Sequence, residues 1–183
     1  FAVGVLLAGP ITVWAADEPL FPKGAQDFSL AASYAAPFGG EEEFGGEDEQ
    51  LASVSQAYGY NLFDNFVLVP KLTEHYVFSD EHDSVGLDFT LSLRWHFIQC
   101  ERWTFFVQGG GGFAYFTRRV PEGTTNFNFV SRLGPGFTYL LEDNCHLIGG
   151  VDWLHISNAE IAGAPRHGGL NSAQFYLGLL WTF

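Results

Sequence analysis

A histidine and a serine two residues apart, His155 and Ser157, are residue types that can carry out nucleophilic hydrolysis. In a β-strand, residues two apart point to the same face, so the imidazole and the hydroxyl would be neighbours. The imidazole can then take the serine proton as a general base, while the serine oxygen attacks an ester carbonyl. The structural alternative is that both residues simply mark the polar end of a strand.

The segments that must position this pair alternate between apolar and small or polar residues, with the period of two that is typical of β-strands. Segment 85–97 is the clearest, because its odd-numbered residues are all large and apolar. Segment 66–78 contains Pro70, and the pattern does not say which of its faces is the apolar one. Eight strands are predicted: residues 27–38, 52–62, 66–78, 85–97, 103–115, 127–139, 146–157 and 174–183.

The predicted connections alternate between long loops (39–49, 79–84, 118–125, 158–172) and short turns (63–65, 98–101, 141–145). Each strand has one continuous apolar face, and its other face is rich in Gly, Ser, Thr and Asn. This pattern favours an all-β fold, an eight-stranded antiparallel transmembrane β-barrel with lipid outside and small polar residues inside. The alternative is a lipocalin-like soluble barrel with its apolar face inward.

Both ends of the chain point to export. Residues 1–16 are apolar and end in Ala15-Ala16, as in a signal peptide that lacks its basic start, although a buried N-terminal helix is the alternative. The mature barrel would then comprise residues 17–183. The last strand alternates and finishes in Phe183, which resembles the assembly signal of bacterial outer-membrane barrels and implies the barrel-assembly machinery as a partner. A net charge of −13 argues against a nucleic-acid partner.

In the seventh predicted strand, His155 and Ser157 share their parity with Leu147, Val151 and Trp153. If these apolar residues form the lipid-facing side, the imidazole and the hydroxyl also face outward. They would lie at the end of the strand nearest a long loop, at the level of the lipid headgroups. An ester in a lipid is therefore the expected substrate.

The run His155-Ile156-Ser157-Asn158-Ala159, with Gly169-Leu170-Asn171-Ser172 further on, resembles the motif of PagL-type lipid A 3-O-deacylases, also labelled acyloxyacyl hydrolases. The resemblance implies an outer-membrane barrel whose outer wall carries a serine nucleophile, a histidine base and an acid. By position it assigns these catalytic roles to Ser157, His155 and Asn171, and the oxyanion hole to Asn158 and Ala159.

The family pattern has Glu where this chain has Asn171. An amide oxygen can orient a histidine, but it cannot offset the charge of the imidazolium. Glu160 is the nearest carboxylate in the sequence and is an alternative third member. Asn171 is expected on the outer face, because it shares the odd parity of Phe175 and Phe183.

The resemblance thus implies a carboxylic ester hydrolase that removes an acyl chain from the lipid A of lipopolysaccharide and needs no cofactor. The alternative is a structural or adhesive barrel with a degenerate triad, and palmitoyl transfer to lipid A is a third chemistry that such barrels support. Cys100 and Cys145 both fall in predicted periplasmic turns and could pair, although these turns are not adjacent.

Overall fold

Eight β-strands follow one another in sequence order, and each is antiparallel to the next. The structure is a computed structural model and describes residues 19–38, 49–80, 82–122, 124–159, 161 and 169–183. The strands are β1 (Gln26–Pro37), β2 (Gln50–Phe63), β3 (Phe66–Phe78), β4 (Ser84–Gln99), β5 (Trp103–Phe116), β6 (Phe127–Glu142), β7 (Cys145–Ser157) and β8 (Gly169–Thr182). The predicted number, order and direction of the strands are confirmed.

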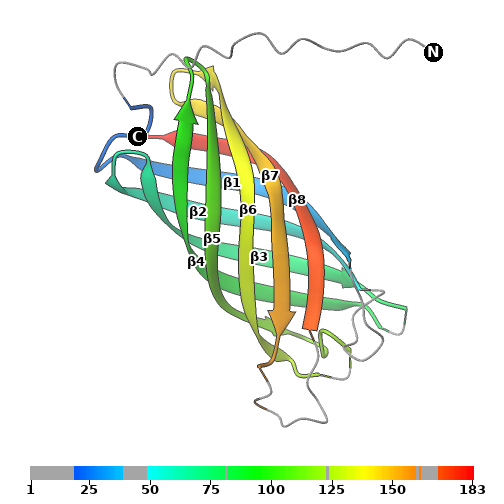
Figure 1. Cartoon of the computed structure of the whole chain (residues 1–183). Coiled ribbons are helices and arrows are strands. Elements are labelled where there is room, and N and C mark those ends of the chain that lie inside the picture. The colour runs from blue at the N-terminus through cyan, green and yellow to red at the C-terminus, as the bar shows by residue number, and fades with distance from the viewer. Residues whose placement is uncertain (1–18, 39–48, 81, 123, 160, 162–168) are drawn as a thin grey trace, which may run out of the picture.

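β1 also pairs with β8, from Asp27↔Thr182 to Pro37↔Ser172, and this pairing closes the sheet into a barrel (Figure 1). A closed barrel has no free sheet edge. The short turns and the C-terminus lie at one end, and the C-terminal ends of β1, β3, β5 and β7, where the longer connections begin, lie at the other (Figure 1). We refer to these as the short-turn end and the long-loop end. Within the described ranges, no helix has the length and apolar character needed to cross a membrane.

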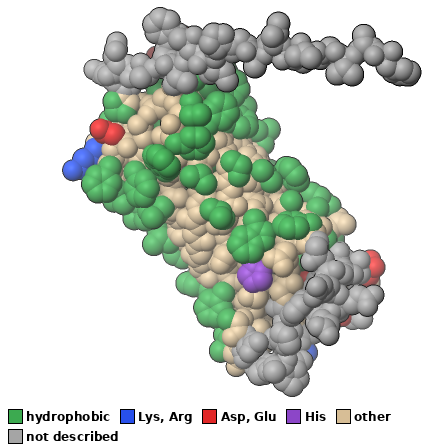
Figure 2. Space-filling model, viewed as in Figure 1, with side chains coloured by type: hydrophobic (Ala, Val, Ile, Leu, Met, Phe, Trp, Pro, Cys, Tyr) green, Lys and Arg blue, Asp and Glu red, His purple; other side chains and the backbone are tan. Residues whose placement is uncertain are grey.

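Large apolar side chains cover the outside of the barrel. In β4, every second residue from Val85 to Phe97 is 41–54% exposed. Figure 2 shows hydrophobic side chains over the visible wall, with acidic and basic side chains only towards its two ends. Soluble monomers rarely expose continuous apolar patches above about 600 Å². The wall therefore suits contact with lipid, and the lipocalin-like alternative with an inward apolar face is wrong.

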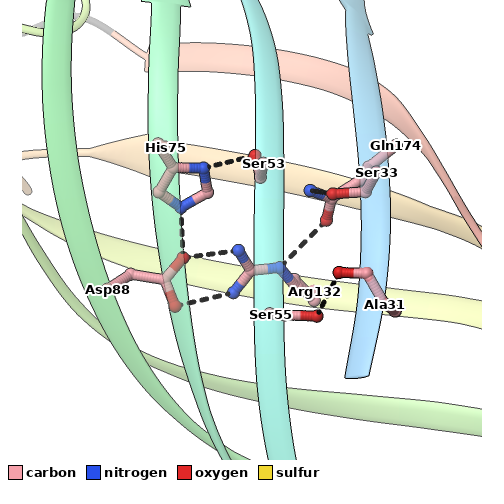
Figure 3. Close-up of polar contacts among 8 residues, drawn as sticks. All are labelled: Ala31, Ser33, Ser53, Ser55, His75, Asp88, Arg132 and Gln174. Atoms are coloured by element: carbon pink, nitrogen blue, oxygen red, sulfur yellow. Dashed lines mark hydrogen bonds and ion pairs between the residues drawn. The ribbon is translucent and has the colours of Figure 1, made fainter. Parts of the chain in front are cut away.

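The inside of the barrel is filled by polar side chains that bond to one another. Asp88 accepts from Arg132 at 2.5 and 3.3 Å and contacts the Nε2 atom of His75 at 2.6 Å. Arg132 also donates to Gln174 at 3.1 Å, and Gln174 donates to Ser33 at 3.0 Å (Figure 3). These side chains come from strands on opposite sides of the barrel, so the network ties the walls together across the lumen.

Apolar clusters close this polar lumen at both ends. The cluster at the long-loop end includes Leu51, Phe116, Leu154 and Ile156, and all four side chains are fully buried. The cluster at the short-turn end gathers around Phe21 and contains the residues Phe21, Phe106, Ile148 and Leu180. The inner faces of the strands are therefore polar in the middle and apolar towards the ends.

This arrangement explains why the pattern of segment 66–78 is ambiguous. Val67, Val69 and Val77 of β3 point inward and are buried, as are Thr73 and His75 between them. The outer face of β3 is also largely apolar, so neither parity stands out in the sequence.

The four glycines 109–112 lie within β5. At Gly112, an added Cβ atom would lie 1.9 Å from the carbonyl oxygen of Phe89 on the neighbouring strand. Strands β4 and β5 can approach this closely only because the residue has no side chain.

Three predictions need correction or comment. β8 begins at Gly169 and not at Gln174, so residues 169–172 belong to a strand and not to the predicted loop 158–172. Cys100 and Cys145 carry free thiols and do not form the disulfide that the sequence left open. The predicted signal peptide, residues 1–16, lies outside the described residues.

Candidate active site

The end of β7 and the start of β8 bring the sequence-predicted residues together. In the register of these two strands, His155 lies opposite Asn171, and Ser157 lies opposite Gly169. All three polar residues have the odd parity of the outward face, and each is half-buried. The predicted outward direction of the histidine and the serine is confirmed.

The three side chains form a continuous chain of hydrogen bonds. The Nε2 atom of His155 is 3.0 Å from the Ser157 hydroxyl, and its Nδ1 atom is 3.0 Å from the Oδ1 atom of Asn171. A base that contacts a nucleophile on one side and an orienting group on the other is the arrangement needed to activate a serine. We call these three residues the outer cluster.

A fourth side chain, Trp153, contacts the outer cluster. Its indole N–H donates to the Oδ1 atom of Asn171 at 3.1 Å, and its ring stacks on that of His155, with 5.6 Å between centroids. Sequence reasoning placed Trp153 on the apolar outer face but gave it no polar role. A signal was present, since Trp153 precedes His155 by two residues and therefore lies beside it on the same face.

Gly169 leaves room for the imidazole. A Cβ atom at this position would lie 3.0 Å from the Cε1 atom of His155 and 3.7 Å from the Cβ atom of Ser157. The first of these distances is shorter than ordinary van der Waals contact. A side chain at residue 169 would therefore displace the imidazole from its present position.

The chain turns immediately after Ser157. Asn158 and Ala159 follow the last pair of the β7–β8 ladder and so lie outside the strand pairing. Ala159 has a φ of 48°, in the left-handed region that non-glycine residues seldom adopt. Asn158 is fully buried, and its carbonyl oxygen accepts from the N–H of Ile161 at 3.1 Å. Glu160, the alternative acid, lies outside the described residues.

A second serine–histidine arrangement, in this case with a carboxylate as its third member, lies inside the barrel. The Nδ1 atom of His75 is 2.7 Å from the Ser53 hydroxyl, and its Nε2 atom is 2.6 Å from Asp88 (Figure 3). Sequence reasoning missed this group, although Ser53 and Asp88 are both expected on the polar face of their strands. All three side chains are buried, and Asp88 also forms an ion pair with Arg132. We call Ser53, His75 and Asp88 the inner cluster.

The two clusters have similar contacts and very different surroundings. The inner cluster lies between the apolar ends of the lumen, where a lipid acyl chain has no access. The outer cluster lies on the wall beside exposed Phe129 and Trp153. Access to lipid, and not hydrogen-bond geometry alone, therefore marks the outer cluster as the candidate active site.

Comparison with known protein families identifies the chain. The family model of lipid A 3-O-deacylase (PagL) matches residues 45–179. This chain belongs to the lipid A 3-O-deacylase family. The matched range covers β2 to β7 completely and includes every residue of the outer cluster. A search of curated proteins found no match.

Solved structures agree on the fold of this deacylase-family protein. The outer-membrane enzyme PagL matches with a TM-score of 0.67 and 17% identity, over 82% of this chain and 97% of that chain. Neisserial surface protein A (NspA) matches with a TM-score of 0.61 and 12% identity, over 87% of this chain and 96% of that chain. The N-terminal barrel domain of Pseudomonas aeruginosa OprF gives a TM-score of 0.56 and 15% identity, with coverages of 88% and 98%.

At these identities the structural matches establish the barrel fold. The family match, together with the apolar wall, places the protein in the bacterial outer membrane, as predicted. Membership of a lipid A deacylase family likewise supports the predicted esterase class in general terms.

Proposed function

We propose that the protein hydrolyses an ester-linked acyl chain of lipid A, with Ser157 as the nucleophile and His155 as the general base. The observation that supports this proposal is the chain of contacts Asn171–His155–Ser157 on a wall suited to lipid. Outer-membrane barrels have short periplasmic turns and longer extracellular loops. The outer cluster is at the long-loop end of β7, and hence near the outer leaflet that contains lipid A.

In the proposed mechanism, the Nε2 atom of His155 takes the proton of Ser157 as the serine oxygen attacks the ester carbonyl. The new imidazolium, oriented by Asn171, then gives that proton to the departing sugar oxygen, which leaves an acyl-enzyme on Ser157. A water molecule gives a proton to the same imidazole and attacks the acyl carbonyl, and the imidazolium then returns the proton to the Ser157 oxygen as the fatty acid leaves. Every group needed for these proton transfers comes from the protein, so the proposal includes no cofactor.

The backbone N–H groups of Asn158 and Ala159 are the proposed oxyanion hole. The developing alkoxide needs hydrogen-bond donors that are already in position. Both residues lie within two positions of Ser157 and beyond the last pair of the β7–β8 ladder. The turn at Ala159 has a backbone conformation that changes the direction of the chain at this point.

The C-terminal residue Phe183 is the proposed contact with the barrel-assembly machinery. It ends a strand whose outward residues include Phe175, Leu177 and Leu179, and its side chain is exposed. Its backbone pairs with Gln26, which holds the end of the chain at the closure of the barrel.

Mass spectrometry of lipid A from cells that express the protein tests the proposed activity. The wild-type protein is expected to remove one acyl chain, and Ser157→Ala is expected to abolish that loss. Ser53→Ala, which removes the serine of the inner cluster, is the matched control and is expected to retain activity. Lipid A that is unchanged by a correctly assembled wild-type barrel would refute the proposal and favour a non-catalytic barrel. A gain of one acyl chain would instead indicate acyl transfer.

A further inference from the structure

The amide of Asn171 can adopt two orientations of nearly the same shape, and they have opposite consequences for His155. With the oxygen toward the imidazole, the amide accepts a hydrogen bond from the Nδ1 atom. With the NH₂ group toward the imidazole, the amide donates to that atom instead. A carboxylate at this position has two oxygens and no such choice. With Asn171 in place of an acid, the orientation of the side chain therefore affects which nitrogen of His155 is protonated.

Trp153 supplies that control. Its indole N–H is 3.1 Å from the Oδ1 atom of Asn171, and the Nδ1 atom of His155 is 3.0 Å from the same oxygen. An indole nitrogen can only donate. If the amide were flipped, its NH₂ group would face the indole N–H, and two donors would be opposed without an acceptor. The contact therefore selects the orientation in which the oxygen faces both rings.

The selected orientation decides which nitrogen of His155 has the proton. Because the Asn171 oxygen can only accept, the Nδ1 atom of His155 must carry a hydrogen. The Nε2 atom is then unprotonated and can accept from the Ser157 hydroxyl at 3.0 Å. In the flipped orientation, Nε2 would be protonated, and the imidazole could not take the serine proton.

We infer that Trp153 is a positioning residue that fixes the Asn171 amide and, through it, the tautomer of His155 that can act as a base. The inference rests on the proposed function of the outer cluster. Trp153 also stacks on the imidazole, with an angle of 25° between the two rings, and this contact limits the rotation of the His155 ring. Its specific contribution is the N–H group, because another aromatic ring could provide the stacking.

The test is Trp153→Phe, which keeps an aromatic ring and removes the N–H donor. In the wild-type background, we expect deacylation to fall about tenfold, equivalent to about 1.4 kcal/mol. In the Asn171→Asp background, the orientation no longer matters, and the same substitution is expected to change the rate by less than about twofold. Trp103→Phe is the matched control. Trp103 is also 41% exposed on the outer wall, but it is the first residue of β5 and does not belong to the outer cluster.

A measurement of the tautomer separates this inference from the proposed activity. Nitrogen-15 NMR of the imidazole in the folded, detergent-solubilised protein reports which ring nitrogen is protonated, with the His155 signals assigned from a His155→Asn spectrum. The wild-type protein is expected to have hydrogen on Nδ1, and Trp153→Phe to show a substantial share of the other tautomer. An unchanged tautomer in Trp153→Phe, or an equal rate loss in both backgrounds, would overturn the inference. An inactive wild-type protein with the expected tautomers would refute the proposed function alone.

Discussion

Replacing Asn171 with aspartate tests what the amide contributes to the outer cluster. Aspartate has the same shape as asparagine, so it can accept from both Trp153 and His155 where the Oδ1 atom now lies. The difference is a negative charge about one hydrogen-bond length from the imidazole. The charge matters most when His155 becomes an imidazolium, which happens only after the imidazole has taken the serine proton. We therefore expect Asn171→Asp to accelerate deacylation.

The structure limits the size of this acceleration. A hydrogen bond between neutral groups contributes about 0.5–1.5 kcal/mol net, and one to a charged group contributes about 1.5–3 kcal/mol. The difference, about 1 to 1.5 kcal/mol, corresponds to a rate increase of roughly five- to thirteenfold. His155 and Asn171 are half-buried, so screening keeps the gain at the lower end of a charged interaction.

In a serine protease, the opposite change from aspartate to asparagine lowers turnover by about 10⁴, because the wrong histidine tautomer is favoured. If Trp153 already selects the correct tautomer here, Asn171→Asp recovers only the charge effect and not this large factor. The assay is the rate of fatty-acid release from purified lipid A by the refolded protein in detergent. An increase of 10³ or more would show that the wild-type amide faces the wrong way. No increase at all would show that His155 does not become charged during the reaction.

Changes at three places, Arg132, Gly112 and Phe183, test the barrel itself. Arg132→Met should destabilise the barrel by about 3–5 kcal/mol in urea titrations, because the buried Asp88 carboxylate loses its guanidinium partner and keeps only the contact with His75. Removing both charges should restore part of this loss. Gly112→Ala should lower the fraction of folded barrel measured on gels, because the new Cβ atom would clash with the backbone of β4. Gly109→Ala is the control and should leave that fraction unchanged, because the Cβ atom at residue 109 would come closest to a leucine methyl group, at 3.0 Å, which can move. Deletion of Phe183 should lower assembly in cells but leave refolding in detergent intact; equal amounts in the membrane would contradict its proposed role.

The strand pattern is readable from the sequence because the two faces of a membrane barrel meet such different surroundings. From Ser84 to Phe97 in β4, every odd position that faces lipid is apolar, and every even position that faces the lumen is small or polar. The same contrast predicts the outward direction of His155 and Ser157 correctly. It fails in β3, where the apolar residues that close the lumen make the inner face resemble the outer one.

The start of β8 cannot be read in this way. Residues 169–172 are small or polar apart from Leu170, which is the composition of a loop. They form a strand because they pair with the polar end of β7, where His155 and Ser157 are their partners. Local composition therefore predicts the wrong boundary at the very place where the candidate active site is built.

The contacts across the lumen are also beyond sequence reasoning. Parity indicates that Asp88 and Arg132 point inward, but β4 and β6 are not neighbours in the barrel. Even His75 and Asp88, on adjacent strands, are not opposite each other, since His75 pairs with Gly86. Such diagonal and cross-lumen contacts depend on the tilt and stagger of the strands, which alternation does not reveal.

An amide in place of an acid has a physical rationale at this position. A carboxylate on the lipid-facing wall must be kept out of hydrocarbon, and its cost depends on depth, from near zero at the interface to more at the midplane. Asn171 offers the same acceptor to His155 without that charge. We therefore expect Asn171→Asp to lower the stability of the barrel by up to about 1 kcal/mol while it raises the rate. Urea titrations in vesicles of short-chain and of long-chain lipids measure this cost, because a thicker hydrocarbon layer brings residue 171 deeper into the apolar region. An equal change in stability in both kinds of vesicle would show that the charge of Asp does not meet the hydrocarbon.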